Sequence, residues 1–192
     1  VGGGGEHGEV NARQGPDLAG GQKITARGGR SVAQSVGALA AEGLAEIEIG
    51  ARPRVGIVST GDELARLGEI PAPGQIFESN AIMLQALARS AGAEVASVEH
   101  APDALDALTE TLRRGLERDV LIVSGGVSVG DRDFVRPSLG ALGAEIELWR
   151  IALKPGKPFL FGRAGGCALF GLPGNPVSAF CTFLEFVRPA LR

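Results

Sequence analysis

The chain has 192 residues, enough for one sizeable domain with a smaller appendage, and its 44% hydrophobic content excludes an intrinsically disordered protein. A formal net charge of −3 gives no general attraction to nucleic acid or to anionic membranes, and no apolar run is long enough to cross a bilayer. The two cysteines and two histidines lack the paired spacing of a zinc cluster, so we expect buried, unreactive thiols and a reducing cytoplasm.

Residues 1–52 form a glycine-rich region that we separate from the rest of the chain. Glycine accounts for 30 of the 192 residues, about twice its average share, and residues 1–30 are especially rich in it. That stretch shows little apolar periodicity and is typical of loop or extended structure. Ser31 predicts the N-cap of a helix that stops at Gly43, and a short strand is expected at 45–49.

The pattern becomes regular in a second domain, residues 53–192, which begins within a predicted linker at 52–54. We expect strands at 55–59, 94–99, 120–123 and 145–151, and a hairpin of 159–161 with 168–170. We predict helices after Asn80 as far as Gly92, at 103–116, at 134–142 and at 176–191. Strands that alternate with helices predict a three-layer α/β fold, with a mostly parallel sheet and helices on both faces.

In such sheets ligands bind outside the carboxyl ends of the strands, where this chain places polar loops that contain glycine. The first loop is Thr60-Gly61-Asp62-Glu63. Its two adjacent carboxylates suit Mg²⁺ binding or general-base catalysis. A solvated loop in which Asp62 caps a turn fits the same residues.

The second loop, residues 124–133, carries glycines that let backbone N–H groups approach a phosphate. It matches neither a Walker loop nor a dinucleotide fingerprint. Asp131 and Asp133 would repel a bare phosphate, which favours a phosphate bridged by a metal ion. A tight turn between a strand and a helix is the alternative interpretation.

The third loop, residues 150–158, displays Lys154 and Lys157 on a backbone stiffened by prolines. Cations held near each other favour an oxyanion site, although solvated surface charge also fits.

The fourth loop, residues 171–177, places Asn175 as an N-cap and Pro176 in the first turn of a helix. It is either a well-built helix start or a source of free N–H groups for an anionic ligand. His100, alone, is interpreted as a surface residue near a strand end.

Together these segments resemble the molybdopterin molybdenumtransferases, the family of MoeA and of the gephyrin E domain. Five strings carry the resemblance, in the family's order: 55–64, 74–80, 124–133, 153–158 and 171–179. The resemblance implies a MogA-like molybdopterin-binding fold. It also implies a cytoplasmic transferase of molybdenum cofactor biosynthesis, which inserts molybdate into adenylylated molybdopterin, releases AMP and uses Mg²⁺.

The resemblance also implies roles for individual residues. The catalytic residues would be Glu63 and Asp133, and the metal ligands would be Glu63, Asp131 and Asp133. Molybdate would be held by Arg150, Lys154 and Lys157. The adenylylated molybdopterin would be held by Thr60, Gly61, Asp62, Ser124, Gly125, Gly126, Ser128, Pro173, Gly174, Asn175 and Pro176.

Two departures from the family pattern bear on activity. Where the family has an Asp-Asp pair at a strand end, this chain has His100-Ala101. Asp103 lies close by, but its predicted place in a helix argues against it as a substitute. The family's chains are also longer and form homodimers, so we expect residues 1–52 to be a remnant of a preceding domain or linker.

Two other functions stay open. The first is a molybdopterin-binding or scaffolding domain without catalysis. The second is the related adenylyltransferase, which shares the glycine loop but not the strings at 153–158 and 171–179. All three functions call for a small-molecule substrate and for neither nucleic acid nor a membrane.

Overall fold

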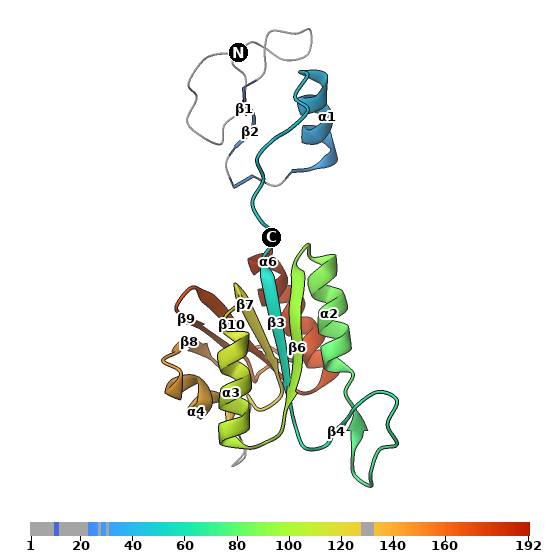
Figure 1. Cartoon of the computed structure of the whole chain (residues 1–192), viewed down its shortest axis with the longest axis vertical. Helices are drawn as coiled ribbons and strands as arrows, with labels where there is room; N and C mark the ends of the chain where they lie inside the picture. The colour runs from blue at the N-terminus through green and yellow to red at the C-terminus, as the bar shows by residue number, and fades with distance from the viewer. Residues whose placement is uncertain (1–9, 12–22, 27, 30, 128–132) are drawn as a thin grey trace. The chain divides into compact units, whose positions relative to one another are not determined.

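The structure is a computed structural model that describes residues 10–11, 23–26, 28–29, 31–127 and 133–192. The chain divides into two compact units, residues 1–51 and residues 52–192 (Figure 1). No helix in the described part of the chain is long and apolar enough to cross a membrane.

The first unit contains a short antiparallel pair, β1 (Val10–Asn11) with β2 (Lys23–Thr25), and the helix α1 (Ala33–Ala41). The predicted N-cap at Ser31 is wrong by one residue. Val32 occupies the N-cap position, and the Val32 N–H donates a hydrogen bond to the Ser35 hydroxyl at 3.0 Å.

The end of α1 is as predicted, because Gly43 follows the helix with a φ of +78° that favours glycine. The predicted strand at 45–49 is wrong. These residues are exposed and lie in no regular element. A strand needs a partner for its backbone groups, and the described residues provide none at this position.

The second unit is built on a six-stranded sheet, which confirms the predicted α/β class (Figure 1). The strands follow the spatial order β6 (Glu94–Ala101), β3 (Arg54–Thr60), β7 (Val120–Ser124), β10 (Cys167–Leu172), β9 (Leu160–Ala164), β8 (Glu145–Trp149). The first four strands pair in parallel, whereas β9 runs antiparallel to both β10 and β8. Arg54, assigned to the linker by its sequence, is instead the first residue of β3.

Helices cover both faces of this sheet. One face carries α2 (Asn80–Ser90) and a terminal stretch made of α5 (Pro176–Thr182), a π-helical turn (Phe183–Val187) and α6 (Arg188–Ala190). The other face carries α3 (Leu105–Gly115) and α4 (Val135–Ala141). The uniform terminal helix predicted at 176–191 is therefore interrupted by a π turn.

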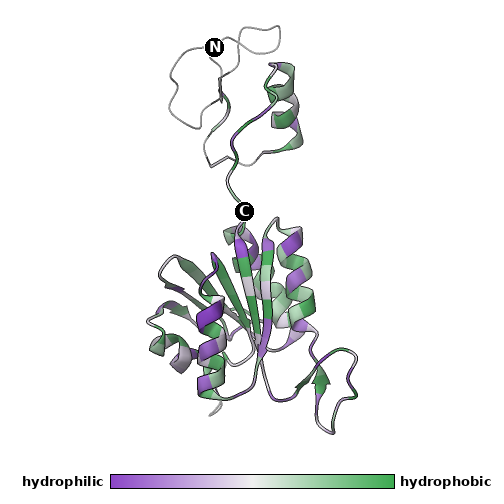
Figure 2. Ribbon diagram, in the orientation of Figure 1, coloured by the Kyte–Doolittle hydropathy of each residue, from purple (hydrophilic) through white to green (hydrophobic). Residues whose placement is uncertain are grey.

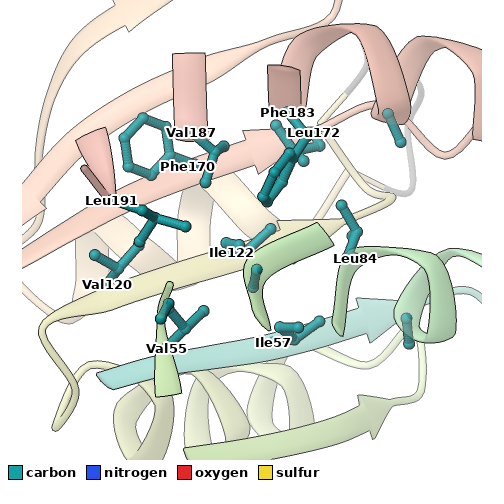
Figure 3. Packing of buried hydrophobic residues seen from close by; sticks show 14 of the residues in the cluster. Val55, Ile57, Leu84, Val120, Ile122, Phe170, Leu172, Phe183, Val187 and Leu191 are labelled. Carbon is teal, nitrogen blue, oxygen red and sulfur yellow. The ribbon is translucent and has the colours of Figure 1, made fainter. Parts of the chain in front are cut away.

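Two apolar clusters hold these layers together. On the first face, Val55 and Ile57 of β3 contact a cluster that includes Leu84 and Phe183 (Figure 3). On the second face, Leu108 of α3 belongs to a separate cluster. The hydropathy colouring shows strands that are largely apolar and a helix α3 that is banded with polar residues (Figure 2). Each fully buried aliphatic side chain contributes about 1.5–3 kcal/mol.

A small lobe between β3 and α2 was not predicted. It contains a parallel pair of two-residue strands, β4 (Leu64–Ala65) and β5 (Ile76–Phe77). Such short strands leave no periodic pattern in a sequence.

The cysteines predicted to be buried, unreactive thiols are Cys167 and Cys181, and both are free. Burial raises the pKa of the Cys167 thiol to about 11, so this thiol stays protonated and unreactive at neutral pH. Cys181 is only partly buried.

Candidate active site

A cavity of about 470 Å³ lies at the carboxyl ends of the parallel strands. Its walls come from the loops that follow β3, β6, β7 and β10, together with the start of α2 and α5. Parallel strands bring their carboxyl ends to one edge of the sheet, so segments distant in the sequence meet there.

The loop after β3 turns sharply at Gly61, whose φ is +147°. The Leu64 N–H donates to the Gly61 carbonyl at 3.1 Å. A Cβ added at Gly61 would lie 2.6 Å from Oε2 of Glu63, because the Glu63 carboxylate folds back over the glycine. Gly61 therefore makes room for Glu63 at the cavity.

The loop after β7 approaches the β3 loop so closely that only glycine fits. Gly125 has a φ of +91°, and a Cβ there would lie 2.5 Å from the carbonyl oxygen of Thr60. At Gly126, φ is +61° and a Cβ would lie 2.7 Å from a methyl group of Val135. The pair brings backbone to the cavity wall, as a phosphate-binding loop requires.

Asn80, the first residue of α2, connects three walls of the cavity. Its Nδ2 donates to Oγ of Ser124 at 3.0 Å and to the carbonyl of Gly174 at 2.7 Å. Asn80 is 8% exposed, and its Oδ1 is buried without a hydrogen-bond partner. Its side chain therefore fixes the spacing of the loops on either side.

The loop after β10 leads into α5 as predicted. The Asn175 side chain accepts a hydrogen bond from the Ser178 N–H at 3.1 Å, which makes Asn175 the N-cap, and Pro176 occupies the first turn.

Asp133 stands just before α4 and lines the cavity. Burial raises the pKa of its carboxyl to about 6, against the opposing effects of the Val135 and Arg136 backbone N–H groups and of the Arg136 charge. Its Oδ1 is buried without a partner. Asp133 is thus a carboxylate whose charge the protein only partly compensates.

The placement of Asp103 corrects the sequence prediction. Helix α3 begins at Leu105, so Asp103 lies in the loop before it and not in the helix. Its carboxylate lines the cavity and accepts a hydrogen bond from Oγ1 of Thr60 at 2.7 Å. His100 and Ala101, by contrast, belong to β6, and neither lines this cavity.

The charged side chains that line the cavity are all acidic among the described residues: Glu63, Glu78, Asp103 and Asp133. The proposed molybdate ligands belong to the loop between β8 and β9 and do not line the cavity. Pro158, in the same loop, does line it. Lys154 and Lys157 are exposed. Arg150 adopts a φ of +66°, and its guanidinium lies 4.5 Å from the ring centre of Trp149.

The structure brings most of the proposed substrate ligands together around the cavity. Those that line it are Thr60, Gly61, Ser124, Gly125, Gly126, Pro173, Gly174 and Asn175. Asp62 and Pro176 do not line it. Ser128 and Asp131 lie outside the described residues.

Four polar residues of the cavity were not assigned to the site from the sequence: Glu78, Asn80, Asp103 and Ser178. The string at 74–80 contains two of them, but Asn80 was interpreted only as the start of a helix. Asp103 lies just after a parallel strand, as the predicted ligand-binding loops do. That position was the signal in the sequence that could have placed Asp103 at the cavity.

The donor set fits a magnesium ion that is shared with a bound phosphate better than one held by protein alone. No three His, Cys, Asp or Glu side chains form a metal cluster within the described residues. Glu63 and Asp133 line one cavity, and Asp133 has an unpartnered oxygen. Mg²⁺ in proteins is commonly held by one or two carboxylates plus substrate phosphates.

The sheet order, the glycine loops and the acidic cavity define an α/β domain with a ligand cavity at the carboxyl ends of its parallel strands. Residues 56–192 match the family described as "Probable molybdopterin binding domain", and the chain belongs to this family.

Among curated proteins, the chain is 41% identical over 186 residues to "Molybdopterin molybdenumtransferase 2" of Mycobacterium tuberculosis (strain CDC 1551 / Oshkosh), covering 94% of this chain and 46% of that protein. It is 37% identical to "Molybdopterin molybdenumtransferase" of Haemophilus influenzae, with 93% and 44% covered. The chain thus spans about half the length of these relatives.

Solved structures agree with this assignment. The molybdopterin biosynthesis MoeA protein of Pyrococcus horikosii superposes with a TM-score of 0.74 at 29% identity, over 91% of this chain and 44% of that one. A MogA structure shares the fold, with a TM-score of 0.54 at 17% identity.

Proposed function

We propose that this chain belongs to a transferase that inserts molybdate into adenylylated molybdopterin and releases AMP. The observation that carries the proposal is the meeting of Glu63 and Asp133, from distant parts of the sequence, at one cavity with the glycine loop at 125–126. Backbone amides suit the substrate phosphates, and two carboxylates suit the ion that accompanies them.

Different residues of the cavity bind the pterin and the magnesium ion. The glycine loop and the turn at 173–175 hold the phosphate-bearing pterin, and Asn80 keeps these two segments at a fixed spacing. Glu63 and Asp133 hold Mg²⁺, which neutralises phosphate charge when bound. Ionised Asp133 is also suited to orient water for cleavage of the bond to AMP.

Molybdate is a tetrahedral dianion and needs fixed cationic donors. We assign it to Arg150, Lys154 and Lys157, which extend from the loop whose Pro158 reaches the cavity. Proline residues in this loop restrict its backbone and so limit the volume that the two lysines can sample.

The test is molybdate-dependent AMP release from adenylylated molybdopterin by the full chain. Glu63→Ala should abolish it, and the matched control Glu69→Ala, an exposed residue of the β4–β5 lobe, should leave it unchanged. Equal activity in Glu63→Ala and the unmodified chain would remove the catalytic assignment of Glu63.

A molybdopterin-binding domain without catalysis is the second candidate. It is favoured by the end of β6, where His100 and Ala101 supply no carboxylate to the cavity. Calorimetry separates the two functions, because molybdopterin binding without AMP release supports the second.

We place the whole protein in the cytoplasm, acting as a homodimer on small-molecule substrates, and residues 1–52 in its preceding domain or linker. Sedimentation analysis of the full chain tests dimer formation directly.

A further inference from the structure

We propose that Asp103 is a positioning residue that holds the loop at 60–63 in the conformation that presents Glu63 to the cavity. The inference rests on the proposed function only for the role given to Glu63. The hydrogen bonds that carry it belong to this chain whatever reaction the site performs.

Asp103 and Asp62 hold each other through reciprocal hydrogen bonds. The Asp103 N–H donates to Oδ1 of Asp62 at 3.1 Å, and the Asp62 N–H points to Oδ2 of Asp103 at 3.4 Å. Oδ1 of Asp103 also accepts from the Thr60 hydroxyl at 2.7 Å. We call this set of three contacts the Asp103 latch.

The register of the sheet explains why the latch forms. β3 and β6 are parallel neighbours in which Thr60 pairs with Ala101, so the residues two positions beyond each strand end meet. Because α3 begins only at Leu105, Asp103 is free of the helix and turns toward the β3 loop. Its side chain is neither fully exposed nor fully buried.

The loop at 60–63 is held from two sides. The Asp103 latch holds it on the side of β6, and the β4–β5 lobe holds it on the other side. Nε2 of Gln75 donates to the Asp62 carbonyl at 3.3 Å, and the Ile76 N–H donates to the Glu63 carbonyl at 2.8 Å. Between these anchors Gly61 holds a φ of +147°, which few residues can adopt. Without Asp103, the loop would keep only the anchors on the lobe side.

Asp103 also lines the cavity, so a direct role of its charge is the competing explanation. Two substitutions separate them. Asp103→Ala removes the charge and the two contacts that the Asp103 carboxylate accepts, and it leaves only the backbone N–H of residue 103 to donate to Asp62. Asp103→Asn removes the charge alone, because its amide oxygen can accept from the Asp62 N–H while its nitrogen donates to the Thr60 hydroxyl.

Hydrogen exchange of the full chain, measured by NMR at the Asp62 and Leu64 amides, tests the latch without reference to the reaction. We expect exchange to rise about tenfold in Asp103→Ala, since losing a hydrogen bond costs about 1.4 kcal/mol. Asp103→Asn and the control Asp106→Asn, an exposed acid in the first turn of α3, should exchange like the unmodified chain.

If Asp103→Ala fails to fold, Thr60→Val replaces it, because it removes the hydroxyl donor of the latch and keeps the side-chain shape. Thr60→Val should also speed exchange, and Thr60→Ser should not. Unchanged exchange in whichever of Asp103→Ala and Thr60→Val folds overturns the proposal.

Molybdate-dependent AMP release gives the second readout. A positioning role predicts a fall in kcat in Asp103→Ala and its recovery in Asp103→Asn. If Asp103→Asn is as inactive as Asp103→Ala while its exchange is normal, the charge acts directly and the positioning role is wrong. If the unmodified chain releases no AMP yet the exchange results hold, the proposed function fails and the latch stands.

Discussion

The side-chain amide of Asn80 donates a hydrogen bond of 2.7 Å to the backbone carbonyl of Gly174, and so joins the start of α2 to the turn before α5. The same amide nitrogen also donates to the hydroxyl of Ser124, at the end of β7. One buried side chain therefore sets the distance between two loops that we assign to substrate binding.

Asn80→Asp should destabilise the fold by about 2–4 kcal/mol at neutral pH, because it replaces two donated hydrogen bonds by a buried carboxylate that faces a carbonyl. Chemical denaturation measures the change. Asn175→Asp is the matched control for stability, since aspartate caps a helix as well as asparagine does. Equal effects of the two substitutions would contradict the structural role of Asn80.

Gly125→Ala should destabilise the protein by about 2 kcal/mol or more and weaken molybdopterin binding, because its Cβ would meet the Thr60 carbonyl and its φ is positive. Gly140→Ala is the control. No atom lies within 4 Å of a Cβ added at Gly140, in α4, so alanine should stabilise this helix by about 0.5–1 kcal/mol. Thermal unfolding and calorimetry check both expectations.

The raised pKa of Asp133 makes stability depend on pH in a defined direction. Its pKa is about 6 in the folded chain against the ordinary value of 3.8, so the folded state holds this proton more tightly than the unfolded state. The stabilisation is present below pH 3.8 and is lost as pH rises through 6.

Asp133→Asn should therefore change stability little at pH 4 and increase it by about 1–2 kcal/mol at pH 8, after allowance for partial exposure. Urea unfolding at both pH values measures the difference, with Asp106→Asn as the control. A gain that is equal at the two pH values would contradict the raised pKa.

Chelation tests the proposed magnesium ion. EDTA should abolish AMP release, and added Mg²⁺ should restore it. If Glu63 and Asp133 hold the ion, Glu63→Gln should raise the Mg²⁺ concentration needed for half-maximal activity, because it removes one of two anionic ligands. Full activity in EDTA would exclude a magnesium requirement.

The elements with strong apolar patterns were predictable from the sequence. The runs at 55–59 and 120–123 became the central strands β3 and β7, and the predicted parallel sheet is present. The predicted strand at 45–49 is wrong, because these residues find no pairing partner among the described residues. The two-residue strands β4 and β5 pair in the structure but were not predicted, because strands this short leave no periodic pattern in the sequence.

The sequence by itself determined the fold class and three of the loops that line the cavity, those after β3, β7 and β10, because apolar periodicity and glycine position are local properties of the chain. Only the tertiary structure decided which polar side chains face one another. Asn80 reaches Gly174 and Asp103 reaches Thr60 through the packing of parallel strands and the exact start of two helices. These distances depend on contacts between residues remote in sequence, which local patterns do not encode.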